Sequence, residues 1–77
     1  MITGSQIRAA KAILHWSGSK LAEKSGVSLS SIRRVESEDG IPKNISVNTI
    51  VSIQQALESA GVEFIGTPDH QPGVRLK

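Results

Sequence analysis

The segment Ser17–Ser37 constrains the fold more than any other stretch of this 77-residue chain. Its first serine is a typical helix N-cap, and Gly26 stands where a short helix must end, because only glycine turns there without a Cβ penalty. Ser28 then caps a second helix, in which Ile32 and Val35 have the spacing of an apolar face. We therefore predict two short helices joined by a tight turn, a helix-turn-helix unit.

The two helices of this unit present different side chains. The positions expected to hold the helix crossing are apolar, namely Leu21, Ala22, Val27, Ile32 and Val35. The outward face of the second helix, over about residues 28–37, has no acidic residue before Glu36 and consists of Leu29, Ser30, Ser31, Arg33 and Arg34. Small polar groups and guanidinium groups at the start of a helix suit the major groove of DNA. Two neighbouring arginines more often serve only as solvated charges on a helix surface. Their place directly after this turn signature favours DNA binding instead.

One start signal occurs four times along the chain. At each occurrence a Ser or Thr directly follows one apolar residue, and a second apolar residue comes four places after that Ser or Thr. This is the pattern of an N-cap with a hydrophobic staple, and the four residues are Thr3, Ser17, Ser28 and Ser46. Gln6 also completes a capping box with the first of them. We therefore predict four helices, of which the first spans about Gly4 to His15 and the fourth about Val47 to Ala60.

The C-terminal segment changes from helical spacing to alternation with period two. Residues 62–65 and 74–77 alternate as strands do, and residues 66–73 between them form a turn-rich loop. Pairing Val62 with Leu76 and Phe64 with Val74 places four apolar side chains on one face and sets Glu63 opposite Arg75. These patterns favour a β-hairpin over a frayed tail, although an isolated hairpin is marginal in water.

Composition excludes several classes of function. Residues 1–45 hold seven Lys or Arg against four Asp or Glu, whereas residues 46–77 hold two against three, so the basic half carries the helix-turn-helix. The chain has no cysteine, no glycine-rich phosphate loop and no paired nucleophile and base, and its two histidines lie far apart. We therefore expect no enzyme activity, no metal and no cofactor. No apolar run reaches the length of a membrane span, so we expect no membrane contact and a cytoplasmic location.

The segment from Ser17 to Glu36 resembles the helix-turn-helix of the Cro and phage-repressor class, the xenobiotic-response-element family of bacterial regulators. The residues that carry the resemblance are Leu21-Ala22, Gly26-Val27-Ser28, Ile32 and Glu36. The whole chain also resembles short bacterial proteins in which helix 5 of the repressor domain is replaced by a segment like residues 61–65 and 73–76. This resemblance implies a mainly α, lambda-repressor-like DNA-binding domain of four to five helices over residues 1–61, with a β-hairpin over residues 62–77 in place of helix 5.

The resemblance also implies roles for individual residues. Leu29, Ser30 and Arg34 match positions that touch base edges, and Ser31 and Arg33 lie beside the adjacent backbone. The remaining expected DNA contacts are Ser17, Lys43 and Asn44, the last two in the loop that usually grips phosphate. Lys11 and Glu36 match a pair that ties the first helix to the third.

Two features of the chain depart from the family pattern. Gly18 stands where the family commonly has Gln, whose side chain spans a phosphate and the third helix. Glu38 and Asp39 also put negative charge near the expected DNA path. The sequence shows these departures but not what compensates for them.

From these observations we expect sequence-specific binding of double-stranded DNA by a transcriptional regulator, acting as a repressor and as a homodimer. Two copies on half-sites about 34 Å apart would give one short recognition helix its specificity. The expected dimer contact is the apolar hairpin face of Val62, Phe64, Val74 and Leu76, with Val51 lining it. One alternative is that the hairpin folds back over the fourth helix of its own chain. Another is an interaction module without DNA binding, or an antitoxin-like regulator whose hairpin binds a partner protein.

Overall fold

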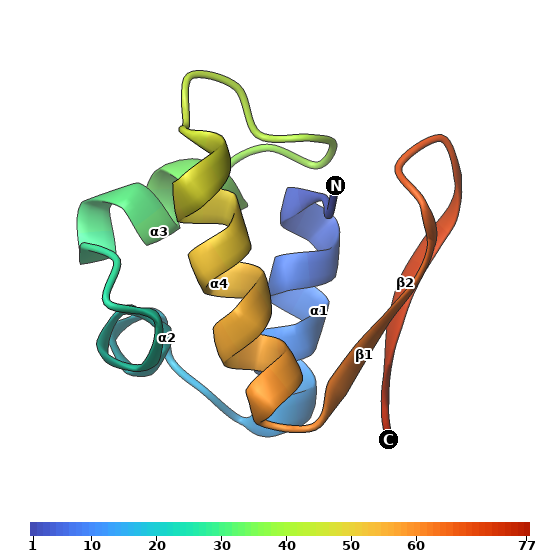
Figure 1. The fold of residues 1–77 in the computed structure, drawn as a ribbon, viewed down its shortest axis with the longest axis horizontal. Coiled ribbons are helices and arrows are strands. Elements are labelled where there is room, and N and C mark those ends of the chain that lie inside the picture. Colours follow the sequence, from blue (N-terminus) through green and yellow to red (C-terminus); the bar gives the residue numbers. More distant parts are fainter.

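The computed structural model describes residues 1–77 as four helices and one antiparallel hairpin. Its elements, in chain order, are α1 (Gly4–Leu14), α2 (Gly18–Ser25), α3 (Leu29–Glu36), α4 (Val47–Ser59), β1 (Val62–Thr67) and β2 (His70–Leu76). In Figure 1, α4 crosses the middle of the molecule, with α2 and α3 on one side of it and α1 and the hairpin on the other. None of the helices has the length and apolar character needed to cross a membrane.

All four predicted N-caps are confirmed. The side chains of Thr3, Ser17, Ser28 and Ser46 each accept a hydrogen bond from the backbone N–H three residues further on. The predicted capping box is present too, because Gln6 Oε1 accepts from the N–H of Thr3 at 2.8 Å. The helix α1 ends one residue earlier than predicted, since His15 adopts a left-handed conformation with φ 57°. Gly26 ends α2 in the same region, with φ 73°.

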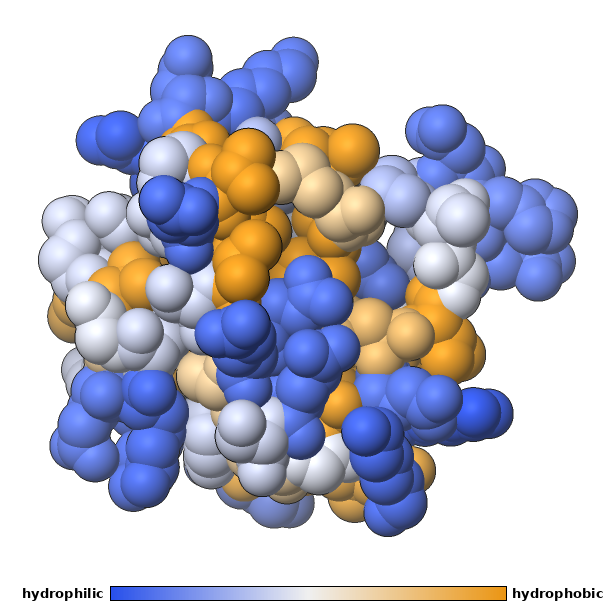
Figure 2. All heavy atoms as spheres, in the orientation of Figure 1, coloured by the Kyte–Doolittle hydropathy of each residue, from blue (hydrophilic) through white to orange (hydrophobic).

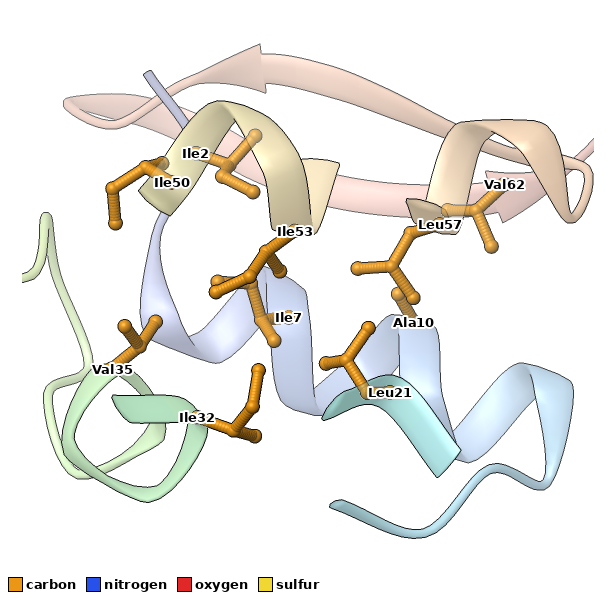
Figure 3. Packing of buried hydrophobic residues seen from close by; sticks show 10 residues of the cluster. All are labelled: Ile2, Ile7, Ala10, Leu21, Ile32, Val35, Ile50, Ile53, Leu57 and Val62. Carbon is orange, nitrogen blue, oxygen red and sulfur yellow. The ribbon is translucent and has the colours of Figure 1, made fainter. Parts of the chain in front are cut away.

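The hydrophobic core draws on every helix and on β1. Its ten side chains are Ile2, Ile7, Ala10, Leu21, Ile32, Val35, Ile50, Ile53, Leu57 and Val62. In Figure 3, Ile7 of α1 and Ile53 of α4 point toward each other, while Ile32 of α3 lies below this pair and Leu21 of α2 to its right. The inward positions predicted for the second and third helices thus meet α1 and α4, which fixes the outward face of α3.

The hairpin has the predicted register. Val62 pairs with Leu76, Glu63 with Arg75 and Phe64 with Val74. The connection is shorter than predicted, because the strands extend to Thr67 and from His70. An irregularity between Ile65 and Thr67 makes this possible: Gly66 has φ 75°, and a Cβ there would lie 2.2 Å from the carbonyl oxygen of Gln71.

One exposed ion pair spans the two strands. Arg75 Nε donates to Glu63 Oε1 at 2.6 Å. This hydrogen bond, together with the attraction between the two opposite charges, lowers the pKa of Glu63 and raises that of Arg75. Both side chains are on the face of the hairpin opposite the paired apolar residues.

The hairpin packs on its own chain, which corrects the expectation of a free apolar face. Val62 is completely buried, and Phe64 and Val74 are partly buried against the core. Val62 is therefore not available as a surface residue for dimerisation. Of the four side chains named for that face, only Leu76 is exposed, by 56%. The strand β1 packs against α4 and β2 packs against α1, so the hairpin covers part of the surface of these two helices.

Candidate nucleic-acid interface

The surface of α3 follows from how the helix is anchored. Ile32 and Val35 are buried, with no exposed surface, so residues on the opposite side of the helix point away from the core. Ser30, Arg33 and Arg34 are accordingly exposed. The structure therefore brings together on one helix the polar residues that the sequence singled out there.

Three hydroxyl groups meet at the start of α3. Ser28 Oγ accepts from the N–H of Ser31 at 3.3 Å and donates to Ser31 Oγ at 3.0 Å. Ser30 Oγ lies 3.2 Å from Ser28 Oγ. Hydroxyls can both donate and accept, so this group can adapt to either kind of base-edge atom.

The cationic side chains of α3 and of the loop after it have no ion-pair partner. Four of the nine basic side chains form ion pairs: Arg8 with Asp39, Lys11 with Glu36, Lys20 with Glu23, and Arg75 with Glu63. The others, which have no carboxylate within 4.0 Å, are Lys24, Arg33, Arg34, Lys43 and Lys77. Three of these belong to α3 or to the loop after it. The free positive charge is thus concentrated on the predicted recognition helix and its following loop.

A shallow hollow of about 490 Å³ separates the start of α2 from α3. It is lined by Lys11, Ser17, Gly18, Ser19, Leu29, Arg33, Glu36 and Ser37. A Cβ on Gly18 would lie 3.2 Å from Leu29 Cδ1, so the side chain of Leu29 leans over this glycine and is partly buried. The space beside Gly18 is therefore partly filled by Leu29, which has less surface free for contact with a base than its place on α3 suggested.

Beside this hollow lies the predicted ion pair between α1 and α3. Lys11 Nζ is 2.8 Å from Glu36 Oε1, and the two side chains are only 18% and 14% exposed. This confirms a partly buried pair that joins the helices. Because Glu36 is neutralised inside the molecule, its charge opposes a nearby phosphate less than its place at the end of α3 suggests.

The loop between α3 and α4 presents the remaining predicted contacts. Lys43 and Asn44 are both exposed, and Asn44 has φ 59°. Arg8, which the sequence did not single out, contacts the start of this loop: Arg8 Nη2 is 2.5 Å from Asp39 Oδ1. The one signal for Arg8 was its place three residues before Lys11, which puts both cations on one face of α1.

Other regions of the molecule contain fewer candidate functional side chains. No group of three His, Cys, Asp or Glu side chains could hold a metal ion. A second hollow of about 440 Å³ lies between the ends of α2 and α4 and is lined by Trp16, Lys24, Ser25, Ser52, Gln55, Ala56, Ser59 and Ala60. It contains a single charged side chain and none of the predicted DNA contacts.

The chain matches no protein-family model, and no curated protein matches it.

Proposed function

We propose that this chain binds double-stranded DNA with sequence preference, places α3 in the major groove and acts as a transcriptional repressor. The observation that carries the proposal is the distribution of unpaired cations. Arg33, Arg34 and Lys43 have no carboxylate partner and lie on α3 or its following loop. A helix with free guanidinium groups beside a basic loop offers both base readout and phosphate contact.

The proposed contacts divide by chemistry. Arg34, with Ser30, donates to base edges, and guanine is the usual partner of an arginine fork. Lys43 and Asn44 contact phosphate, which positions the helix without reading sequence. Leu29 supplies a limited apolar contact for a thymine methyl, because part of its side chain is covered by Gly18. The other proposed DNA contacts, beside the backbone, are Ser17, Ser31 and Arg33.

Titration of labelled duplex DNA at several salt concentrations tests this proposal. Affinity for arbitrary duplex DNA should fall as salt rises, with a slope set by the number of phosphates neutralised. Selection from a random duplex pool should then yield a preferred site. If no duplex bound even at low salt, the proposal would be refuted and an interaction module would be favoured.

Three substitutions separate base readout from phosphate contact. Arg34→Ala should cost about 1–3 kcal/mol of binding free energy and relax preference at one base position. Lys43→Ala should weaken all duplexes alike and lower the salt slope by about one. Lys24→Ala is the matched control, since Lys24 is exposed and unpaired but lies in the last turn of α2. Equal weakening of all duplexes by Arg34→Ala would make Arg34 a phosphate contact.

We further propose that two copies act together, because one short helix reads few base pairs. Figure 2 shows hydrophobic side chains gathered over the first half of α4 and the neighbouring loop. Val51 is 40% exposed there, with Val47 and Ile41 also exposed, while Leu76 is exposed on β2. Val51→Glu and Leu76→Glu, each followed by sedimentation and DNA titration, test the two surfaces separately. Unchanged mass and affinity in both variants would refute a dimer through these residues.

A hairpin that binds a partner protein is the second candidate. Ile65 and Leu76 remain exposed on the two strands, and a hairpin presents unpaired strand edges. Purification of the chain from its host, with and without Leu76→Glu, would test this reading. A protein that copurifies only with the unaltered chain would support an antitoxin-like role.

A further inference from the structure

The first turn of α1 binds the segment that follows α3. The N–H groups of Gly4 and Ser5 donate to the carbonyl oxygens of Gly40 and Asp39, at 2.9 and 3.3 Å. N–H groups in the first turn of a helix have no partner inside it, so these bonds satisfy two of them. A Cβ on Gly4 would lie 1.8 Å from the carbonyl oxygen of Glu38, so this approach requires glycine.

The guanidinium group of Arg8 donates hydrogen bonds to the same segment. Arg8 Nη1 donates to the carbonyl oxygens of Glu36 and Glu38, the latter at 3.3 Å. Arg8 Nη2 donates to Asp39 Oδ1 at 2.5 Å and to Ser5 Oγ at 3.1 Å. One planar fork thus joins α1 to both the main chain and a side chain of residues 36–39. A lysine could not replace it, because an ammonium group is a point charge on a flexible stem.

This contact has two consequences for the loop that carries Lys43 and Asn44. The segment bonded to α1 ends at Gly40, three residues before Lys43, so these hydrogen bonds fix the position from which the chain continues to Lys43. Arg8 also neutralises Asp39, whose side chain is 89% exposed and would otherwise repel a nearby phosphate. Compensation for Asp39, one of the two acidic residues that depart from the family pattern, therefore comes from α1, whereas the carboxylate of Glu38 has no cation within 4.0 Å.

We propose that Arg8 is a positioning residue for DNA binding, which acts by holding residues 36–40 so that Lys43 meets the phosphate. The proposal rests on the proposed function. It assigns to Arg8 no contact of its own with DNA, and it makes the effect of Arg8 on DNA binding dependent on Lys43.

The first arm of the test needs no DNA. Amide hydrogen exchange should be about tenfold faster at Gly4 and Ser5 in Arg8→Met than in the unaltered chain, because their acceptors are released. The amides of Gln6 and Ile7 are internal controls, since both bond to Thr3 within the same helix start. Arg8→Lys should show the same loss as Arg8→Met, and it serves in place of that variant should the latter unfold. Unchanged exchange at Gly4 and Ser5 in both variants would overturn the holding role.

The second arm measures the salt dependence of DNA affinity. Arg8→Met should weaken binding about tenfold at low salt and reduce the slope by about one, as Lys43→Met does. The double variant should lose little more than either single variant, because both remove the same contact. Lys24→Met controls for the simple loss of one positive charge. Thermal unfolding followed by circular dichroism confirms that each variant is folded at the temperature of the titration.

Two further outcomes would overturn the proposal. Additive losses in the double variant would mean that Arg8 acts independently of Lys43, and full affinity in Arg8→Lys would reduce its role to charge alone. Asp39→Asn combined with Arg8→Met separates these readings further: continued weak binding supports positioning, and restored affinity refutes it. Failure of the unaltered chain to bind any duplex would instead refute the proposed function, and with it the DNA-binding part of this inference, while the exchange arm still judges the holding role.

Discussion

Replacement of Gln6 by Met should destabilise this protein far more than an ordinary surface substitution. Gln6 is 4% exposed, and its side chain makes three hydrogen bonds. Its Oε1 accepts from the N–H of Thr3 at 2.8 Å, and its Nε2 donates to the carbonyl oxygens of Ile65 and Gly73 at 3.2 and 2.9 Å. The same amide therefore caps α1 and fastens the hairpin to it.

The expected loss can be worked from these bonds. Met leaves the buried N–H of Thr3 without an acceptor, at a cost of about 1–3 kcal/mol. The two hairpin carbonyls each lose the hydrogen bond from Gln6 Nε2, at about 0.5–1 kcal/mol apiece, while the apolar side chain recovers part of the total by burial. We therefore expect Gln6→Met to lower the free energy of unfolding by about 2–4 kcal/mol. A chain of 77 residues is typically stable by about 4–12 kcal/mol, so the variant should remain measurable but much weakened.

Urea and thermal unfolding followed by circular dichroism provide the assay. A loss of about 2 kcal/mol should lower Tm by at least about 8 °C in a domain of this size. Gln54→Met is the matched control, because Gln54 is a partly buried glutamine whose one side-chain hydrogen bond, to Glu58 at 3.3 Å, is exposed. That control should stay within about 0.5 kcal/mol of the unaltered chain. If the two variants lost the same stability, the double role of Gln6 would be wrong.

Three further sets of substitutions test separate parts of the structure. Lys11→Met or Glu36→Gln should each cost about 2 kcal/mol, since each leaves one charge of a partly buried pair alone, and additive losses in the double variant would remove the pair from the account. Gly4→Ala should cost at least about 1–3 kcal/mol because its Cβ meets main-chain oxygens, whereas Gly40→Ala, with nothing within 4 Å, should be nearly neutral by the same unfolding assay. Since the pKa of Glu63 is lowered in the folded state, its ion pair stabilises the protein above about pH 4.5, and that stabilisation is lost as pH falls through the lowered pKa. The Tm of Glu63→Gln should therefore approach that of the unaltered chain in acid. A difference in Tm that did not change with pH would contradict this.

The sequence by itself determined the local structure. Each N-cap depends on a bond to the residue three places on, so Ser17, Ser28 and Ser46 could be identified from their neighbours. The hairpin register follows in the same way, because alternation with period two allows Val62 to pair with Leu76 while both stay on one face. The position of Arg34 on the outward face followed from helical spacing.

The tertiary structure alone decided how these elements meet. The bonds from Gln6 to Ile65 and Gly73 join residues 59 and 67 positions apart, and the contact of Arg8 with Glu38 joins residues 30 apart. No periodicity encodes such pairs, because they depend on which faces remain uncovered once four helices have packed. The same reason explains the error over Val62, whose pattern specified a strand with an apolar face but not what that face would cover. Burial against α1 and α4 follows from the shape of the assembled core, to which residues from the whole chain contribute.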